Sequence, residues 1–215
     1  MAAQDLPIRC SCGAVRGSLA AAEPAAGNHV ICYCDDCQAF AHALGRAGDV
    51  LDACGGSEIV QVSPARIRFE AGADRLACLR LTAKGPFRWY TSCCNTPIGN
   101  TLASGAVPFI GMVCACLDAP REAIDTMLGP IRGRVFREFA TCEPSSLAPG
   151  VPMWRLMLRF VRVLVLARLR GEQRRSPFFD ASTGNPVAEP RVLSASEREQ
   201  LPPYRRAGAA PTTRA

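Results

Sequence analysis

Three cysteines lie close together in the segment HVICYCDDCQAF, residues 29–40. Cys32 and Cys34 are two residues apart in what we predict to be a β-strand, so their side chains point to the same side of it. A turn through the two aspartates that follow would bring the thiol of Cys37 to the same point. Three thiolates can hold a metal ion and leave one coordination position open, which is typical of a reactive or exchangeable ion. The alternative is that the three are small buried side chains that happen to be neighbours.

Zinc is the ion that this set of sulfur ligands favours, because zinc is redox-silent and accepts tetrahedral thiolate ligands. Sulfur ligands alone leave iron and copper(I) open as alternatives. An open position on such an ion can accept the thiolate of a small molecule or polarise the oxygen of an aldehyde. We therefore expect one or two zinc ions as cofactor, depending on whether the remaining cysteines form a second site.

A second set of cysteines is divided between two distant parts of the chain. Cys10 and Cys12 lie in RCSCGAVRG, and Cys93 and Cys94 lie in WYTSCCNTPIGN, at the expected end of a strand. A metal ion between these segments would join distant parts of a small β domain. Adjacent cysteines on a strand point to opposite faces, so the late pair is not expected to chelate one ion together unless the backbone is irregular there.

The elements that would position these cysteines are mainly β-strands. Residues 65–72 alternate apolar and charged side chains with the period of two that a half-buried strand shows. Residues 75–94 are predicted to form a hairpin with its turn at 84–86, and a further strand is expected over 107–118. One short helix is expected to begin after the second cysteine of the first cluster and to end at Gly45.

The composition changes after Cys142, and we predict four segments from it. Residues 1–142 would form a zinc-binding β domain and 143–152 a linker. Residues 153–175 would form a basic amphipathic helix, and 176–215 an extended or disordered tail. The predicted fold class is thus mainly β, with antiparallel sheets, cysteine clusters of the zinc type and a C-terminal amphipathic helix.

The helix expected over 153–175 has two interpretations. Trp154, Leu158, Val161 and Val165 recur at helical spacing, so this face could pack on the domain or form a homodimer contact. Alternatively, the arginines that flank a wide apolar stripe could make peripheral contact with an anionic membrane. Because these arginines interrupt the apolar stretch, the helix is not expected to cross a bilayer.

Taken in order, the motifs CSCG, CYCDDC and CCNTPIGN, the last of which follows an arginine-rich hairpin, resemble the glutathione-dependent formaldehyde-activating enzymes. The resemblance covers residues 9–117. It implies a β-tent fold of antiparallel sheets and a carbon–sulfur lyase activity. It also implies a structural zinc between the first Cys-x-Cys and a late Cys-x-x-Cys, and a second zinc on the middle Cys-x-Cys-x-x-Cys.

Carried over residue by residue, the resemblance implies two ligand sets. The second zinc, where catalysis would take place, would be held by Cys32, Cys34 and Cys37. The structural zinc would be held by Cys10, Cys12 and Cys94. The sequence departs from the family pattern at Thr91, which stands where the first cysteine of the late pair is expected. The structural site would then be completed by Cys93 on an irregular backbone or by another thiol, or it would hold no ion.

The activity that the resemblance implies is the addition of formaldehyde to glutathione, giving S-hydroxymethylglutathione, or the reverse cleavage. Glutathione carries two carboxylates, so cations near the metal would be needed to hold it, and Arg80, Lys84 and Arg88 on the hairpin are the candidates. The alternative is that these cations form the exposed face of the hairpin. A different function class is a non-catalytic zinc module whose basic helix recruits a partner or a membrane surface.

The 215 residues carry a formal net charge of +6. The charges are mixed along most of the chain and no familiar nucleic-acid-binding module accompanies them, so we expect a small-molecule thiol or an aldehyde adduct as partner and no nucleic acid. The first ten residues lack the basic start and apolar run of a secretory signal, from which we expect a cytoplasmic protein. In that reducing compartment, closely spaced cysteines more often hold a metal than form disulfides.

Overall fold

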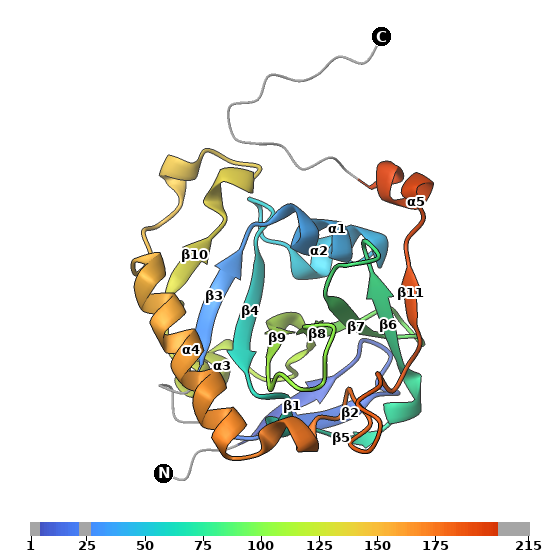
Figure 1. Cartoon of the computed structure of the whole chain (residues 1–215). Coiled ribbons are helices and arrows are strands. Elements are labelled where there is room, and N and C mark those ends of the chain that lie inside the picture. The colour runs from blue at the N-terminus through green and yellow to red at the C-terminus, as the bar shows by residue number, and fades with distance from the viewer. Residues whose placement is uncertain (1–4, 22–26, 202–215) are drawn as a thin grey trace.

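The computed structural model describes residues 5–21 and 27–201, and Figure 1 shows the arrangement of their elements. These residues form two β-sheets and a few helices. The prediction of a mainly β fold is therefore confirmed. The part of the predicted tail that covers 202–215 lies outside the described residues.

The larger sheet has eight strands in the order β10-β3-β4-β9-β8-β7-β6-β11. Its strands are β10 (Gly133–Val135), β3 (Asn28–Cys32), β4 (Ser57–Val62), β9 (Ile110–Val113), β8 (Pro97–Thr101), β7 (Phe87–Thr91), β6 (Leu76–Arg80) and β11 (Pro190–Val192). The strands between the two edges pair antiparallel, whereas β10 and β11 join the edges in parallel. The predicted hairpin is formed by β6 and β7.

The smaller sheet is antiparallel and has three strands in the order β1-β2-β5. Its strands are β1 (Leu6–Arg9), β2 (Arg16–Leu19) and β5 (Ile67–Ala71). In Figure 1 it lies at the bottom of the molecule, below the ends of the central strands of the larger sheet.

Five α-helices and six short 3-10 segments connect and cover the sheets in the described part of the chain. The α-helices are α1 (Asp35–Ala43), α2 (Ala47–Val50), α3 (Arg121–Leu128), α4 (Met153–Leu169) and α5 (Ala195–Gln200). The 3-10 segments are η1 (Pro64–Arg66), η2 (Ala73–Arg75), η3 (Cys114–Cys116), η4 (Arg137–Phe139), η5 (Pro144–Ser146) and η6 (Glu172–Arg175). The strand expected over 107–118 is shorter than predicted, because β9 ends at Val113 and η3 follows it.

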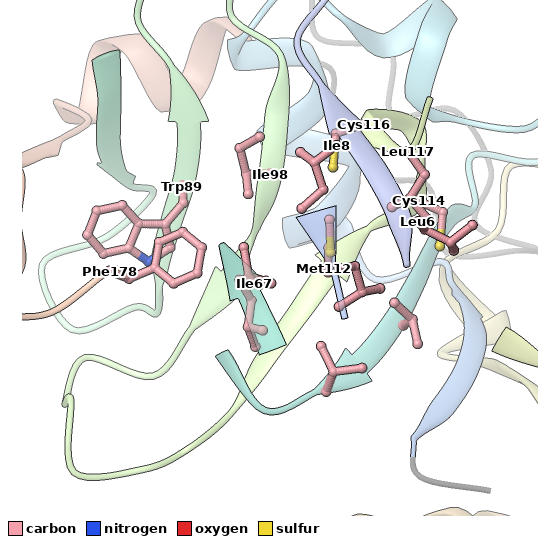
Figure 2. Close-up of a cluster of buried hydrophobic side chains, with 14 of the residues drawn as sticks. Leu6, Ile8, Ile67, Trp89, Ile98, Met112, Cys114, Cys116, Leu117 and Phe178 are labelled. Carbon is pink, nitrogen blue, oxygen red and sulfur yellow. The ribbon is translucent and has the colours of Figure 1, made fainter. Parts of the chain in front are cut away.

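The main hydrophobic core joins both sheets, and Figure 2 shows its side chains. Ile8 of β1 and Ile67 of β5 belong to the same buried cluster as Trp89 of β7 and Met112 of β9. The indole N–H of Trp89 donates a hydrogen bond of 2.9 Å to the hydroxyl of Thr101. The one polar atom of the largest buried side chain is thus satisfied, as burial of a donor requires.

The segment after residue 176 contributes to this core, although the sequence predicts an extended or disordered tail there. Phe178 is fully buried, and its ring centroid lies 5.1 Å from that of Trp89. Further along, β11 pairs with β6, and Ser194 caps α5 through a capping box with Glu197. The segment packs on the domain because Phe178 and Phe179 fill the core beside Trp89 and because β11 pairs with β6.

Helix α4 turns a different face to the domain from the one that the sequence suggested. Trp154, Leu158, Val161 and Val165 are exposed, whereas Leu156 is buried. A Cβ atom at Gly133 of β10 would lie only 2.6 Å from a Leu156 methyl carbon, so a larger residue there would force the Leu156 side chain to shift. Within the described residues, no helix is long and apolar enough to cross a membrane.

Candidate metal centres

The first cysteine cluster, formed by Cys32, Cys34 and Cys37, lies where β3 passes into α1. Cys32 ends β3, Cys34 is the residue before α1, and Cys37 lies in the first turn of that helix. The backbone carbonyl of Cys34 accepts hydrogen bonds from the N–H groups of Cys37 and Gln38. This turn brings the three sulfur atoms within 4.8 Å of one another, and Cys32 and Cys34 are 3.3 Å apart. Cys34 is partly exposed, whereas the other two thiols are buried.

Arg88 places a buried positive charge beside this cluster. Only 3% of its side chain is exposed, and it donates hydrogen bonds of 2.9 Å to Asp36 and 3.0 Å to Asn100. Hydrogen bonds from Cys32 and Cys34, assisted by the charge of Arg88, hold the pKa of Cys37 well below its ordinary value in spite of burial. Hydrogen bonds with Cys34 and Cys37, together with burial, raise the pKa of Cys32. The cluster therefore favours one thiolate with protons shared among its neighbours, and a cation can replace those protons.

The second cluster is formed by Cys10, Cys12, Cys93 and Cys94. The sulfur of Cys10 lies 3.5 Å from that of Cys12 and 3.9 Å from that of Cys93. Cys93 is 3.4 Å from Cys12 and 3.8 Å from Cys94, and all four sulfur atoms lie within 4.8 Å of one another. The cluster joins the loop after β1 to the turn between β7 and β8.

Both clusters have the dimensions of a tetrahedral thiolate site. Metal–sulfur bonds of about 2.3 Å, as zinc makes, place neighbouring sulfur atoms about 3.8 Å apart. The separations of 3.4–3.9 Å in the second cluster, and of 3.3 Å in the first, are close to that length. Either cluster could therefore hold a metal ion without a large movement of the chain. The second offers four ligands and the first offers three.

The adjacent cysteines of the second cluster converge because they do not lie on a strand. Strand β7 ends at Thr91, and a turn follows in which Asn95 has a φ of 56°. Asparagine is one of the few residues that adopt this left-handed conformation readily. The N–H of Asn95 donates to the carbonyl of Thr91 at 2.8 Å and closes the turn. Cys93 can thus supply the sulfur ligand that Thr91 lacks. A regular strand through residues 93 and 94 would instead point the two cysteines to opposite faces.

Hydroxyl groups around Cys94 favour its thiolate form. Burial raises its pKa, but hydrogen bonds from Ser11, Thr91 and Thr96 outweigh burial and lower the pKa to about 4. The hydroxyl of Thr91, which stands where the family pattern has a cysteine, lies 3.4 Å from the sulfur of Cys94. A thiolate is the form in which cysteine binds a metal.

The three hairpin cations do not form one cluster. Arg88 faces the first cysteine cluster and stands opposite Leu79 across the β6–β7 pair. Arg80 is one residue further along and points to the other face, where it donates to the carbonyl of Gly85. Lys84 is exposed in the turn of the hairpin. Of the three, only Arg88 is placed to act on the first cluster.

A third group, around His29, has no signal in the sequence beyond a lone histidine in a predicted strand. The two nitrogens of the buried imidazole lie 2.6 Å from a carboxylate oxygen of Glu58 and 2.8 Å from the carbonyl oxygen of Gly129. Arg121 also binds Glu58, at 2.7 Å. Although burial opposes ionisation, hydrogen bonds from His29 and Arg121 lower the pKa of Glu58 to about 2. Cys114 lies beside the pair, but the contact of 2.6 Å is that of a hydrogen bond and fits an ion-pair network better than a metal site.

A disulfide joins Cys54 to Cys142, two cysteines whose partners are not evident in the sequence. Their Cα atoms are 5.0 Å apart although 88 residues separate them along the chain. The N–H of Thr141 also donates a hydrogen bond to the carbonyl of Cys54. The disulfide and this hydrogen bond together join the segment after η4 to the loop after α2. Structural disulfides are rare in a reducing cytosol, and the expectation drawn for closely spaced cysteines did not cover two that lie so far apart in the sequence.

A family model described as "Family of unknown function (DUF6151)" matches residues 2–191, which include both cysteine clusters, the disulfide and α4. No curated protein matches the sequence.

Proposed function

The chain belongs to the DUF6151 family, and from this premise we propose that it is a zinc-dependent carbon–sulfur lyase-like protein that acts on adducts of a thiol with an aldehyde. The motifs that resemble the formaldehyde-activating enzymes make glutathione and formaldehyde the first substrates to test. In this proposal the second cluster holds a structural zinc and the first holds a reactive one.

The convergence of Cys32, Cys34 and Cys37 is the observation that carries this function. The group consists of three sulfur ligands, with no fourth histidine, cysteine or carboxylate joining it among the described residues. Three protein ligands leave a coordination position for an external molecule, whereas four close a site. The partly exposed thiol of Cys34 marks the side from which such a molecule would approach.

The reaction forms or breaks one carbon–sulfur bond. In the direction of synthesis, the thiolate sulfur of the substrate bonds to the carbonyl carbon of the aldehyde, the π electrons move to oxygen, and the oxygen takes a proton. A bound zinc ion would favour the thiolate form of the substrate and polarise the aldehyde oxygen. Arg88 would offset the negative charge that the cysteine thiolates bring to the buried site.

The residues around α1 offer charges for the carboxylates of glutathione. Arg198 of α5 lies 3.9 Å from Asp35 and 4.0 Å from Asp36, at the N-terminus of α1. Because it is about one quarter exposed, it can reach an arriving anion more readily than the buried Arg88. We therefore assign the recognition of a substrate carboxylate to Arg198, and charge compensation at the metal to Arg88.

A second function is favoured by one observation. The cleft of about 550 Å³ in this structure lies beneath α4 and is lined by none of the seven cysteines of the two clusters. A non-catalytic module, in which both zinc ions hold the fold together and the protein binds a partner or membrane elsewhere, would place its cleft in this way.

We keep the cytoplasm as the proposed compartment, with which the ten free cysteines agree better than the disulfide does.

Metal counting and a turnover assay separate the two functions. Native mass spectrometry of the purified chain should show two zinc ions, and Cys34→Ser should lose one of them and stay folded. Two-dimensional exchange NMR on glutathione and formaldehyde should then show interconversion faster than the spontaneous reaction with the wild-type protein, and no enhancement with Cys34→Ser.

Cys78→Ser is the matched control, because Cys78 is a buried thiol outside both clusters. It should keep two zinc ions and full activity. If the wild-type protein binds two zinc ions but leaves the exchange rate at its spontaneous value, the lyase function is excluded and the non-catalytic module remains. If Cys34→Ser unfolds, the first cluster is structural.

A further inference from the structure

Helix α4 presents an unbroken apolar stripe to solvent. Figure 1 shows the helix on the outer side of the larger sheet, beyond β3 and β10. The stripe residues recur every three or four positions, and between about half and four fifths of each is exposed. They are Trp154, Leu158, Val161, Val165 and Leu169. Monomeric proteins rarely expose a contiguous row of large apolar side chains unless something binds there.

The charges that flank this stripe are all positive. From Val151 to Gly171 the chain has no acidic residue and carries arginine at 155, 159, 162, 168 and 170. The nearest carboxylate, Glu172, comes only after the helix ends and lies 4.0 Å from Arg170. The surface therefore combines a strip that prefers an apolar environment with a border that attracts anions.

A cationic cleft opens along one border of the stripe, between α4, η6 and the end of β2. Its volume is about 550 Å³, which is within the usual range of binding sites for small ligands. Its charged lining residues are Arg66, Arg159, Arg162, Arg170, Arg175 and Glu172. Among the described lining residues, five guanidinium groups face one carboxylate, and even with Asp5, whose carboxylate acts on Arg66, positive charge is in surplus. Val163, Leu166 and Ala167 form an apolar wall within it.

Two arginines of the cleft, Arg159 and Arg162, are close enough for the charge of one to disfavour the charge of the other. Burial lowers the pKa of Arg159, and the neighbouring charges of Arg132 and Arg162 lower it further. An anion with several oxygen atoms would relieve this repulsion, since guanidinium groups bind phosphate through paired hydrogen bonds. The arrangement therefore favours a phosphate group over a single carboxylate.

We propose that α4 and this arginine cleft form a binding surface for anionic phospholipid bilayers. The apolar stripe lies in the acyl boundary, the flanking arginines extend to the headgroups, and the cleft takes a lipid phosphate. Interfacial helices with arginine on one face and tryptophan and leucine on the other bind membranes in this way. The helix lies on the membrane and does not cross it, in keeping with its length and its arginines.

Charge argues against a second copy of the chain as the occupant of this surface. A symmetric dimer buries the same patch on both subunits, so arginine would be brought against arginine. Within 151–171 there is no carboxylate to pair with these side chains. Anionic headgroups supply the missing negative charge, whereas a dimer partner would not.

Vesicle flotation of the full chain tests this surface. The protein should float with vesicles of phosphatidylcholine mixed with phosphatidylglycerol. It should remain at the bottom of the gradient when the vesicles contain phosphatidylcholine alone. Because the attraction is partly electrostatic, binding should weaken as salt is raised. Each basic residue near an anionic membrane contributes about fivefold to partitioning, so Arg170→Ala/Arg175→Ala should weaken binding roughly 30-fold.

Two further variants separate charge from insertion. Leu158→Gln/Val165→Gln should weaken binding at all salt concentrations, because it removes apolar groups that are already exposed in the free protein. Arg75→Ala is the matched control, since Arg75 is an exposed arginine on η2 and outside the cleft. It should bind vesicles as the wild type does, and every variant should keep the wild-type metal content.

Tryptophan fluorescence gives an independent readout, because the chain has only two tryptophans and Trp89 is fully buried. Anionic vesicles should shift the emission of Trp154, which is 62% exposed, to shorter wavelength. Trp154→Phe should abolish the shift.

Three results would each overturn this assignment. The first is equal flotation with zwitterionic and anionic vesicles, or none with either. The second is binding of inorganic phosphate or pyrophosphate by the cleft, measured by calorimetry, without binding to vesicles, which would mark a site for a soluble anion. The third is a dimer by light scattering that Leu158→Gln/Val165→Gln dissociates, which would mark a self-association surface.

Discussion

The two cysteine clusters differ in how the chain assembles them. Cys32, Cys34 and Cys37 meet through one turn, so little chain has to be ordered before their sulfur atoms converge. The second cluster joins positions 81 or more residues apart. Closing so long a loop removes much more freedom from the unfolded chain, so a metal bound there would stabilise the fold more than a metal in the local cluster.

The two clusters also differ in their number of sulfur atoms and in the groups that surround them. The local cluster has three sulfur atoms beside the buried Arg88, whereas the distant cluster has four sulfur atoms beside the hydroxyls of Ser11, Thr91 and Thr96. A fourth ligand closes a site, and a missing ligand leaves it open to exchange. The comparison thus separates a cluster suited to holding the fold from one suited to chemistry, and unfolding free energies can test that separation.

Cys10→Ser should have the largest effect, because it removes a ligand from the cluster that closes the long loop. We expect the protein to lose one metal ion and about 4 kcal/mol of unfolding free energy, measured by chemical denaturation. Cys116→Ser is the control for placing a hydroxyl in the core, since Cys116 is buried and belongs to neither cluster. Equal losses in both variants would mean that burial, and not metal binding, makes Cys10 important.

Glu58→Gln should have the next largest effect on unfolding free energy, through the network that Glu58 forms with His29 and Arg121 outside both clusters. The pKa of Glu58 is about 2, against an ordinary value of 4.5, so its ionisation stabilises the fold above pH 4.5 and this contribution is lost as pH falls toward 2. Since a quarter of the side chain is exposed, we expect a loss of about 2 kcal/mol at neutral pH.

The difference between the wild type and Glu58→Gln should shrink below pH 4.5, as measured by urea denaturation over a series of pH values. A difference that stayed constant down to pH 2 would show that the pKa of Glu58 is the same in the folded and unfolded states. The metal content at neutral pH should be unchanged, because neither cluster includes this residue.

Arg88→Met should act on the local cluster from outside it. We expect metal affinity at that cluster to fall roughly 10- to 100-fold, as for other residues that contact metal ligands, with a loss of about 2 kcal/mol in unfolding free energy. Competition with a zinc chelator would measure the affinity. Arg88→Lys keeps the charge and should recover part of it, whereas Arg80→Met, on the other face of the hairpin, should leave it unchanged.

Cys34→Ser should have the smallest effect on stability and the largest on chemistry. The loss in unfolding free energy should stay within about 1 kcal/mol, because the cysteine is partly exposed and its cluster spans a single turn. Thermal unfolding followed by circular dichroism would measure it. A loss as large as that of Cys10→Ser would erase the distinction between the two clusters.

Local patterns in the sequence were sufficient for the mainly β class, for the β6–β7 hairpin and for the convergence of the first cluster. Each depends on neighbouring residues: period-two alternation, a Gly-Pro turn, and cysteines two and three residues apart. The same rule does not apply to Cys93 and Cys94, because β7 ends at Thr91 and a turn with a left-handed Asn95 follows, which is the irregular backbone that the sequence had left open.

What the amino-acid order determined by itself is therefore the mainly β class, the β6–β7 hairpin and the ligands that one turn can gather. Only the tertiary structure decided that Phe178 completes the core, that Cys54 pairs with Cys142, that Arg88 and not Arg80 faces the cysteines, and which side of α4 stays in solvent. These outcomes depend on contacts between segments far apart in the chain. A local sequence pattern carries no record of such contacts, because packing in three dimensions selects them from many alternatives of similar composition.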